Sequence, residues 1–101
     1  MVQIKWTKRA LNDLWKIYEF IANDSPRYAQ IQVEKIQTAV SNLAVFPSLG
    51  RQVPEFPHLP YREVLVGNYR VIYREEEKRR QVLIMPIVHG RQLLKERPNY
   101  H

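Results

Sequence analysis

The sequence predicts an α+β fold, in which an N-terminal strand is followed by an antiparallel helical hairpin packed on a mostly antiparallel sheet that ends in a three-strand meander. Three observations predict it. Apolar residues follow a helical spacing in the first half, prolines interrupt the middle, and β-rich runs joined by a Gly-Asn pair fill the second half. Because 101 residues have room for one hydrophobic core, we expect one domain over residues 1–101.

The first part of the chain predicts a short strand and a helix. Residues 2–6 alternate between apolar and polar side chains, which is typical of a strand, and Thr7 is a good N-cap for a helix over Lys8–Ala22. We expect Trp6 and Trp15 in the core, whereas Phe20 falls outside the apolar stripe of this helix and is available to a partner. The stripe consists of Leu11, Leu14, Trp15, Tyr18, Ile21 and Ala22.

A second helix is predicted directly after the first. Ser25 is a favourable N-cap and Pro26 a favourable first helical residue, so the helix should run over Pro26–Phe46. Two amphipathic helices joined by so short a turn are expected to pack as an antiparallel hairpin. The spacing of their apolar residues indicates core packing and implies no cofactor.

The second half predicts a loop and then three strands. Prolines and a glycine between residues 47 and 60 exclude a helix there and indicate a loop that wraps the domain. Strands are expected at Tyr61–Val66, Tyr69–Arg74 and Gln81–Val88, with Gly67-Asn68 as the turn between the first two. The alternation along these strands leaves open which sheet face is the core. The polar segment His89–His101 is either a short helix or a tail.

The charge balance narrows the possible partners. Sixteen Lys and Arg against ten Asp and Glu give a net charge of +6 and a pI near 9.8, which favours a nucleic acid, a ribosome or an acidic protein. The chain has no cysteine, and its three histidines lack metal-ligand spacing, so we expect neither a metal nor a cofactor. No apolar run approaches the roughly 20 residues of a membrane span, and the N-terminus does not have the pattern of a secretory signal.

The chain resembles the RelE/ParE toxin superfamily. The resemblance is carried by YREVLVGNYRVIYR (residues 61–74) and VLIMPIVHGRQLL (residues 82–94). The upstream helix pattern A-L-x-D-L-x-x-I-x-x-F-I and the segment P-x-x-G-R fit the same family. The resemblance covers residues 4–94, and the order and spacing of the pieces are specific although no single piece is.

The resemblance implies a cytoplasmic toxin of a bacterial type II toxin–antitoxin system, which causes growth arrest. Its partner would be a cognate acidic antitoxin, and the complex with that antitoxin offers a route to an oligomer. Two kinds of target occur in the superfamily. RelE-like members cut mRNA in the ribosomal A site as metal-independent endoribonucleases, whereas ParE-like members poison DNA gyrase and have no recognised nuclease centre. The fold does not decide between these targets, because function depends on the site.

If the chain is RelE-like, four residues are candidates for nuclease roles, and the resemblance assigns three of them by position. Arg70 matches the family's sheet arginine, Arg91 matches the basic residue after the last strand, and Arg62 occupies the first lysine position. His89 is the candidate for exchanging protons near neutral pH. The second lysine position falls on Val64, which has no acid–base chemistry, and the tyrosine expected after the last strand has no clear counterpart.

This incomplete set favours a gyrase poison over an mRNA endoribonuclease. His89, Tyr100 and His101 could substitute for the missing groups, but nothing in the sequence places them near Arg70. Arg70 also has a purely structural interpretation, an exposed ion pair with Glu63 worth less than about 1 kcal/mol. Two further functions stay open for the whole chain. One is an inactive or purely antitoxin-binding domain, and the second is a non-toxic nucleic-acid-binding module.

Overall fold

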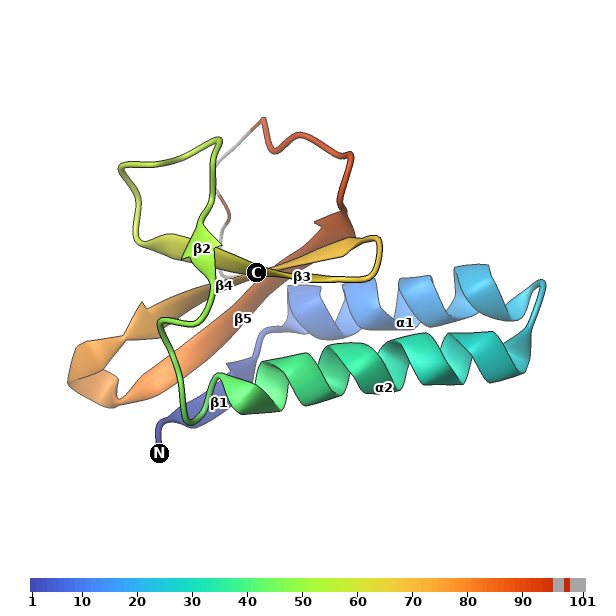
Figure 1. Ribbon diagram of the computed structural model, residues 1–101, viewed down its shortest axis with the longest axis horizontal. Helices are drawn as coiled ribbons and strands as arrows, with labels where there is room; N and C mark the ends of the chain where they lie inside the picture. Colours follow the sequence, from blue (N-terminus) through green and yellow to red (C-terminus); the bar gives the residue numbers. More distant parts are fainter. Residues whose placement is uncertain (96–97, 99–101) are drawn as a thin grey trace.

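The computed structural model, shown in Figure 1, describes residues 1–95 and residue 98, and it confirms the predicted α+β fold. A helical hairpin lies against a five-stranded sheet. None of the helices that the structure describes is long and apolar enough to cross a membrane. In chain order the elements are β1 (Gln3–Trp6), α1 (Lys8–Ala22), α2 (Pro26–Asn42), β2 (Arg51–Gln52), β3 (Tyr61–Val66), β4 (Tyr69–Glu76), a 3-10 turn (Glu77–Arg79) and β5 (Gln81–His89).

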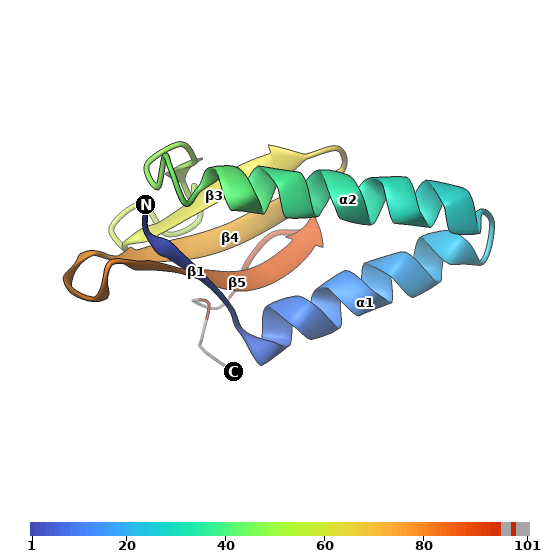
Figure 2. The ribbon, with the colours of Figure 1, turned by 90° about the horizontal axis from the view of Figure 1, so that it is seen from below.

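The sheet has the strand order β1-β5-β4-β3-β2. Strands β2 to β5 pair antiparallel with their neighbours, as the predicted meander requires, whereas β1 pairs parallel with β5 from Gln3 opposite Gln81 to Trp6 opposite Ile84. Figure 2 shows both helices on one face of the sheet, with the hairpin extending past the strand ends on the side of the β3–β4 turn. The other face, turned away from the helices, is called the outer face below.

Helix α1 is fixed to β5 by polar contacts at its start. The Thr7 hydroxyl accepts a hydrogen bond from the Ala10 amide at 3.1 Å, as expected for an N-cap, and donates one to the Ile84 carbonyl at 2.7 Å. Six residues after Thr7, the Asp13 carboxylate accepts a hydrogen bond from the Ile87 amide at 3.0 Å. Because β1 ends opposite Ile84, Asp13 satisfies a backbone donor on the part of β5 that lies beyond β1.

The rotation of α1 differs from the prediction. Its buried residues are Ala10 and Ile17, whereas Trp15 is 58% exposed, so the prediction of a core tryptophan at this position was wrong. The contacts of Thr7 and Asp13 with β5 turn the helix by about one residue position from the expected stripe. Trp6 fits the prediction better, since it is partly buried and packs against the core.

Helix α2 ends at Asn42, not at the predicted Phe46. The amides of Leu43 and Ala44 donate to carbonyls three residues earlier, at 3.0 and 3.1 Å, and this pattern tightens and ends the helix. Pro47 adds a local reason, because the residue before a proline is disfavoured in helical conformation. The start of the helix is as predicted, with the Ser25 side chain accepting from the backbone of the first turn.

Both faces of the sheet are packed, which resolves the question that the alternation left open. The main core lies between the helices and the inner face, and a second, smaller core lies on the outer face beneath residues 53–59 and Leu94. Residues 47–60 form the predicted wrapping loop, apart from the two-residue strand β2. The buried residues of the second core are Val53, Tyr61, Ile72, Met85 and Val88.

Candidate functional site

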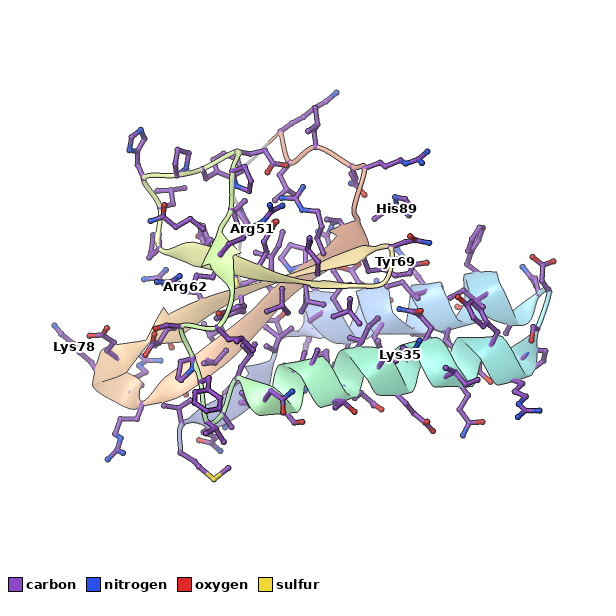
Figure 3. The ribbon with its side chains drawn as sticks, in the orientation of Figure 1. Lys35, Arg51, Arg62, Tyr69, Lys78 and His89 are labelled. Carbon is purple, nitrogen blue, oxygen red and sulfur yellow. The ribbon has the colours of Figure 1, made fainter. Side chains whose placement is uncertain are left out.

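A cavity of about 490 Å³ opens on the outer face of the sheet, where the β3–β4 turn, the end of β5 and the loop after β2 meet. Figure 3 labels three residues of this region, Arg51, Tyr69 and His89, and draws their side chains as sticks. Its walls combine apolar side chains with cations. The lining residues are Arg51, Pro54, Glu55, Leu65, Gly67, Asn68, Tyr69, Arg70, His89, Gly90, Arg91 and Leu93.

Arg70 lies at the base of this cavity with all five guanidinium N–H groups engaged. Its Nη1 and Nη2 donate to the two carboxylate oxygens of Glu55 at 2.7 Å each. Its Nε and Nη2 donate to one oxygen of Glu63 at 2.8 and 2.6 Å, and Nη1 also donates to the Gln92 carbonyl at 2.9 Å. The predicted pairing of Arg70 with Glu63 is confirmed, but the pair is buried and not exposed as expected.

Arg51 completes a network of two cations and two anions. Its Nη2 lies 2.7 Å from the second oxygen of Glu63, whose side chain is fully buried, while the Arg51 side chain is 60% exposed. We call Arg51, Glu55, Glu63 and Arg70 the Arg70 network. A buried carboxylate is tolerated only when it is paired and hydrogen-bonded, and Glu63 has both kinds of partner. The formal charges of the network cancel.

The network changes the ionisation of its own members. The hydrogen bonds from Arg70 lower the pKa of Glu55 to about 2, against the opposing effect of partial burial. The hydrogen bonds that Arg70 donates to Glu55, and then those that it donates to Glu63, raise the pKa of Arg70 further above its ordinary value, against the opposing effect of burial. Arg70 therefore stays protonated at any pH at which the protein is folded, and it has no proton to exchange near neutrality.

The network also holds the segment that follows β5. The Leu94 amide donates to Glu55 at 2.9 Å, and the Gln92 carbonyl accepts from Arg70. Farther along, the buried Tyr61 hydroxyl donates to the Pro98 carbonyl at 3.0 Å. Polar contacts thus fix Gln92, Leu94 and Pro98 on the outer face, and the exposed Leu93 forms part of the cavity wall.

The structure brings three of the four candidate nuclease residues to the cavity. Arg70, His89 and Arg91 line it, whereas Arg62 lies on the inner face of β3, opposite Tyr73, and donates to the Gly50 carbonyl at 2.8 Å. Val64, at the second lysine position, packs against the main core. The candidate substitutes at positions 100 and 101 lie outside the described residues.

His89 and Tyr69 lie opposite each other in the β4–β5 pairing and form an aromatic pair, with ring centroids 5.8 Å apart in an edge-to-face arrangement, and the Tyr69 ring packs against the main core on the inner face. Burial raises the pKa of the Tyr69 hydroxyl, so this group is neutral at physiological pH. The His89 Nδ1 accepts a hydrogen bond from the Arg91 amide at 3.2 Å. In the part of the chain that the structure describes, no group of three His, Asp, Glu or Cys side chains could hold a metal ion.

Glu55 was missed by the sequence reasoning. It lies between Pro54 and Pro57 in a loop for which only a wrapping role was expected. A carboxylate in a loop gives little local signal, because its role depends on where the loop crosses the sheet. The more useful signal was the pair of apolar residues that flank it, Val53 and Phe56. Apolar side chains on both sides of Glu55 indicate a loop that packs against the domain and is not fully solvated.

The chain matches a protein-family model described as the ParE toxin of the type II toxin–antitoxin system parDE, over residues 4–94. Among curated proteins, it is 43% identical over 51 residues to "Toxin RelE2" of Caulobacter vibrioides, covering 50% of this chain and 58% of the relative. It is also 45% identical over 49 residues to "Putative toxin Y4kP" of Sinorhizobium fredii, covering 48% and 51%. The matches span between half and three fifths of the length of these relatives.

Solved structures share the fold. The chromosomal ParDE toxin–antitoxin system from P. aeruginosa matches with a TM-score of 0.69 and 24% identity, covering 88% of this chain and 96% of that one. The toxin–antitoxin complex RelBE2 from Mycobacterium tuberculosis matches with a TM-score of 0.62 and 24% identity, covering 87% and 96%. At this identity the structural matches establish the fold alone, and both RelE-type and ParE-type names occur among the similar proteins.

Proposed function

This chain belongs to the ParE toxin family of type II toxin–antitoxin systems, and on that premise we propose that it is a growth-arresting toxin that poisons DNA gyrase by binding, without cutting RNA. The proposal includes a cytoplasmic location, where gyrase acts, and a cognate antitoxin that neutralises the toxin. Binding to gyrase requires a basic, well-packed domain with an accessible surface. It does not require a side chain that exchanges protons.

The observation that carries the proposal is the engagement of Arg70. Cutting RNA through its 2′-hydroxyl needs a base for the hydroxyl proton, cations for the developing phosphorane charge, and an acid for the leaving oxygen. Arg70 is the cation that the resemblance would place at the phosphate, yet two carboxylates occupy its donors. A phosphate would have to displace Glu55 or Glu63, and the charges of the network already cancel.

The positions of the remaining candidates support the same conclusion. Arg62 lies on the inner face of the sheet and Val64 packs in the main core, so neither reaches the cavity. The endoribonuclease alternative keeps one specific observation in its favour. His89, Arg91 and Tyr69 are among the residues that line one cavity, where an imidazole could transfer protons and a guanidinium could stabilise charge.

Two activity assays on the purified protein test the proposal. We expect inhibition of gyrase supercoiling with accumulation of cleaved DNA, and no ribosome-dependent cleavage of mRNA. The His89→Ala variant should keep its activity against gyrase. If the protein instead cuts mRNA on ribosomes, and if His89→Ala lowers that rate by the factor of about 10² to 10⁴ typical of a lost acid–base group, the endoribonuclease alternative is correct.

The antitoxin part of the proposal rests on charge. A net charge of +6 speeds and orients the encounter with an acidic segment, and we expect binding in the nanomolar range. Expression of the toxin alone should stop growth, and coexpression of the antitoxin should restore it. Unaffected growth at a high level of folded protein would contradict the toxin proposal and favour a non-toxic binding module.

A further inference from the structure

Helix α1 carries an apolar surface that the fold leaves uncovered. Leu11 is 52% exposed and Trp15 is 58% exposed, on the side of the helix turned away from its buried residues. The Trp15 ring stacks on the Tyr18 ring, with centroids 5.8 Å apart and an angle of 15° between the planes. A cavity of about 250 Å³ beside them is lined by aliphatic and aromatic side chains, which are Leu11, Leu14, Trp15, Tyr18 and Val33.

The charges beside this surface form a self-complementary pattern. Lys8 and Glu19 are eleven residues apart, which is close to three helical turns, so both lie on the same side of α1 as Trp15. They are about 16 Å apart along the helix axis, with Trp15 close to the midpoint. Both are exposed, and neither makes an ion pair within the described part of the chain.

The distribution of charge over the chain removes an obstacle to self-association here. Residues 8–42, which span the helical hairpin, contain five cationic and four anionic side chains, so they carry only +1 of the net charge of +6. Two copies that met through the rest of the molecule would repel each other. At the hairpin this repulsion between two copies is weakest. The electrostatic attraction of an acidic partner is also weakest there.

We propose that the Leu11–Trp15 surface of α1 is a self-association site that takes a second copy of this chain, with the two α1 helices antiparallel about a two-fold axis near their midpoint. This arrangement places Lys8 of each copy opposite Glu19 of the other and brings the two Trp15 side chains to the centre. Such an interface is isologous, because the same patch serves on both copies. One helix face from each copy buries less than about 1,200 Å², so we expect a dissociation constant in the micromolar range.

The test uses the full chain, made by cell-free synthesis. Sedimentation velocity is measured at concentrations from about 1 to 500 μM, a range that brackets the expected micromolar dissociation constant. The wild type should pass from monomer to dimer within this range. Lys8→Glu and Glu19→Lys should each weaken the dimer by about tenfold or more, since each change turns two attractive contacts into two repulsive ones. The double variant K8E/E19K should restore the affinity to within about threefold, because the pairs are re-formed with reversed signs.

The design separates dimerisation from folding and from net charge. Glutamate near the start of a helix and lysine near its end both favour the helix, so neither single variant should weaken the fold. Lys78→Glu makes the same charge change as Lys8→Glu at an exposed position on the 3-10 turn, and it should not weaken the dimer. A chain that stays monomeric at all concentrations would overturn the proposal, and so would a double variant that fails to recover. If the chain is monomeric and Trp15→Ala abolishes neutralisation by a coexpressed antitoxin, the surface belongs to that partner.

Discussion

Replacing Arg70 with alanine should destabilise the protein severely, because the change leaves two carboxylates without their main partner. Glu63 has a fully buried side chain and would keep only Arg51, while Glu55 would lose its bidentate partner. Removing one member of a buried, hydrogen-bonded ion pair costs about 3 to 5 kcal/mol. Domains of this size have a free energy of unfolding of about 5 to 15 kcal/mol, so the loss is a large fraction of the total.

Urea denaturation followed by circular dichroism measures this effect. With a slope of about 1 to 2 kcal/mol per molar urea, the midpoint should fall by roughly 1.5 to 5 M, or the variant should be unfolded in buffer. Arg79→Ala is the matched control, since Arg79 is an exposed arginine on the 3-10 turn, and its effect should stay within about 0.5 kcal/mol. A loss below about 1 kcal/mol for Arg70→Ala would refute the reasoning, because Arg70 would then not hold the outer face together and would be available for chemistry.

The remaining predictions concern acid sensitivity, the face of α1 and the cavity. The folded-state pKa of Glu55 is about 2, below its ordinary 4.5, so it stabilises the fold above pH 5 and this contribution disappears as the pH falls towards 2. After allowance for solvent screening of this partly exposed group, the pH-dependent contribution of Glu55 to the free energy of unfolding is about 1 to 2 kcal/mol. Urea titrations at several pH values should show this contribution in the wild type and not in Glu55→Gln. Ile17→Ala should cost about 2 to 4 kcal/mol by calorimetry, while Trp15→Ala should cost less than about 1 kcal/mol at concentrations that keep the chain monomeric. Arg91→Ala should weaken gyrase inhibition by a few fold and His89→Ala hardly at all, because Arg91 contributes charge and the proposal gives His89 no proton to transfer.

The elements that the sequence predicted well are those with local causes. The N-caps Thr7 and Ser25 fixed both helix starts, and the Gly67-Asn68 pair fixed the β3–β4 turn, where Gly67 adopts a positive φ of 58°. The end of α2 was placed four residues too late because apolar residues continue the helical spacing into a turn. The rotation of α1 depends on contacts with β5, more than seventy residues away in the chain, and no local pattern contains that information.

The candidate site divides in the same way. Arg70 and Arg91 could be named from the sequence because the resemblance assigns roles to their positions, and His89 because an imidazole exchanges protons near neutral pH. The partners of Arg70 required the tertiary fold, since Glu55 comes from a loop fifteen residues away and Gln92 from the segment after β5. The pairing with Glu63 was foreseen but its burial was not. Burial arises from a second core on the outer face, and the prediction of a single core did not provide for it.

The Arg70 network separates the charges that build the fold from the charges that a partner can reach. Two arginines and two glutamates cancel within the network, so the whole net charge of +6 lies outside it. Exposed cations remain at Lys78–Arg80 on the β4–β5 turn, and at Arg91 and Lys95 after β5. Since Arg70 and Glu55 hold the segment that carries Arg91, losing Arg70 would weaken target binding through misplacement of that segment and not through loss of its own charge. Loss of function in an Arg70 variant is therefore no evidence of catalysis unless the fold and the position of that segment are shown to be intact.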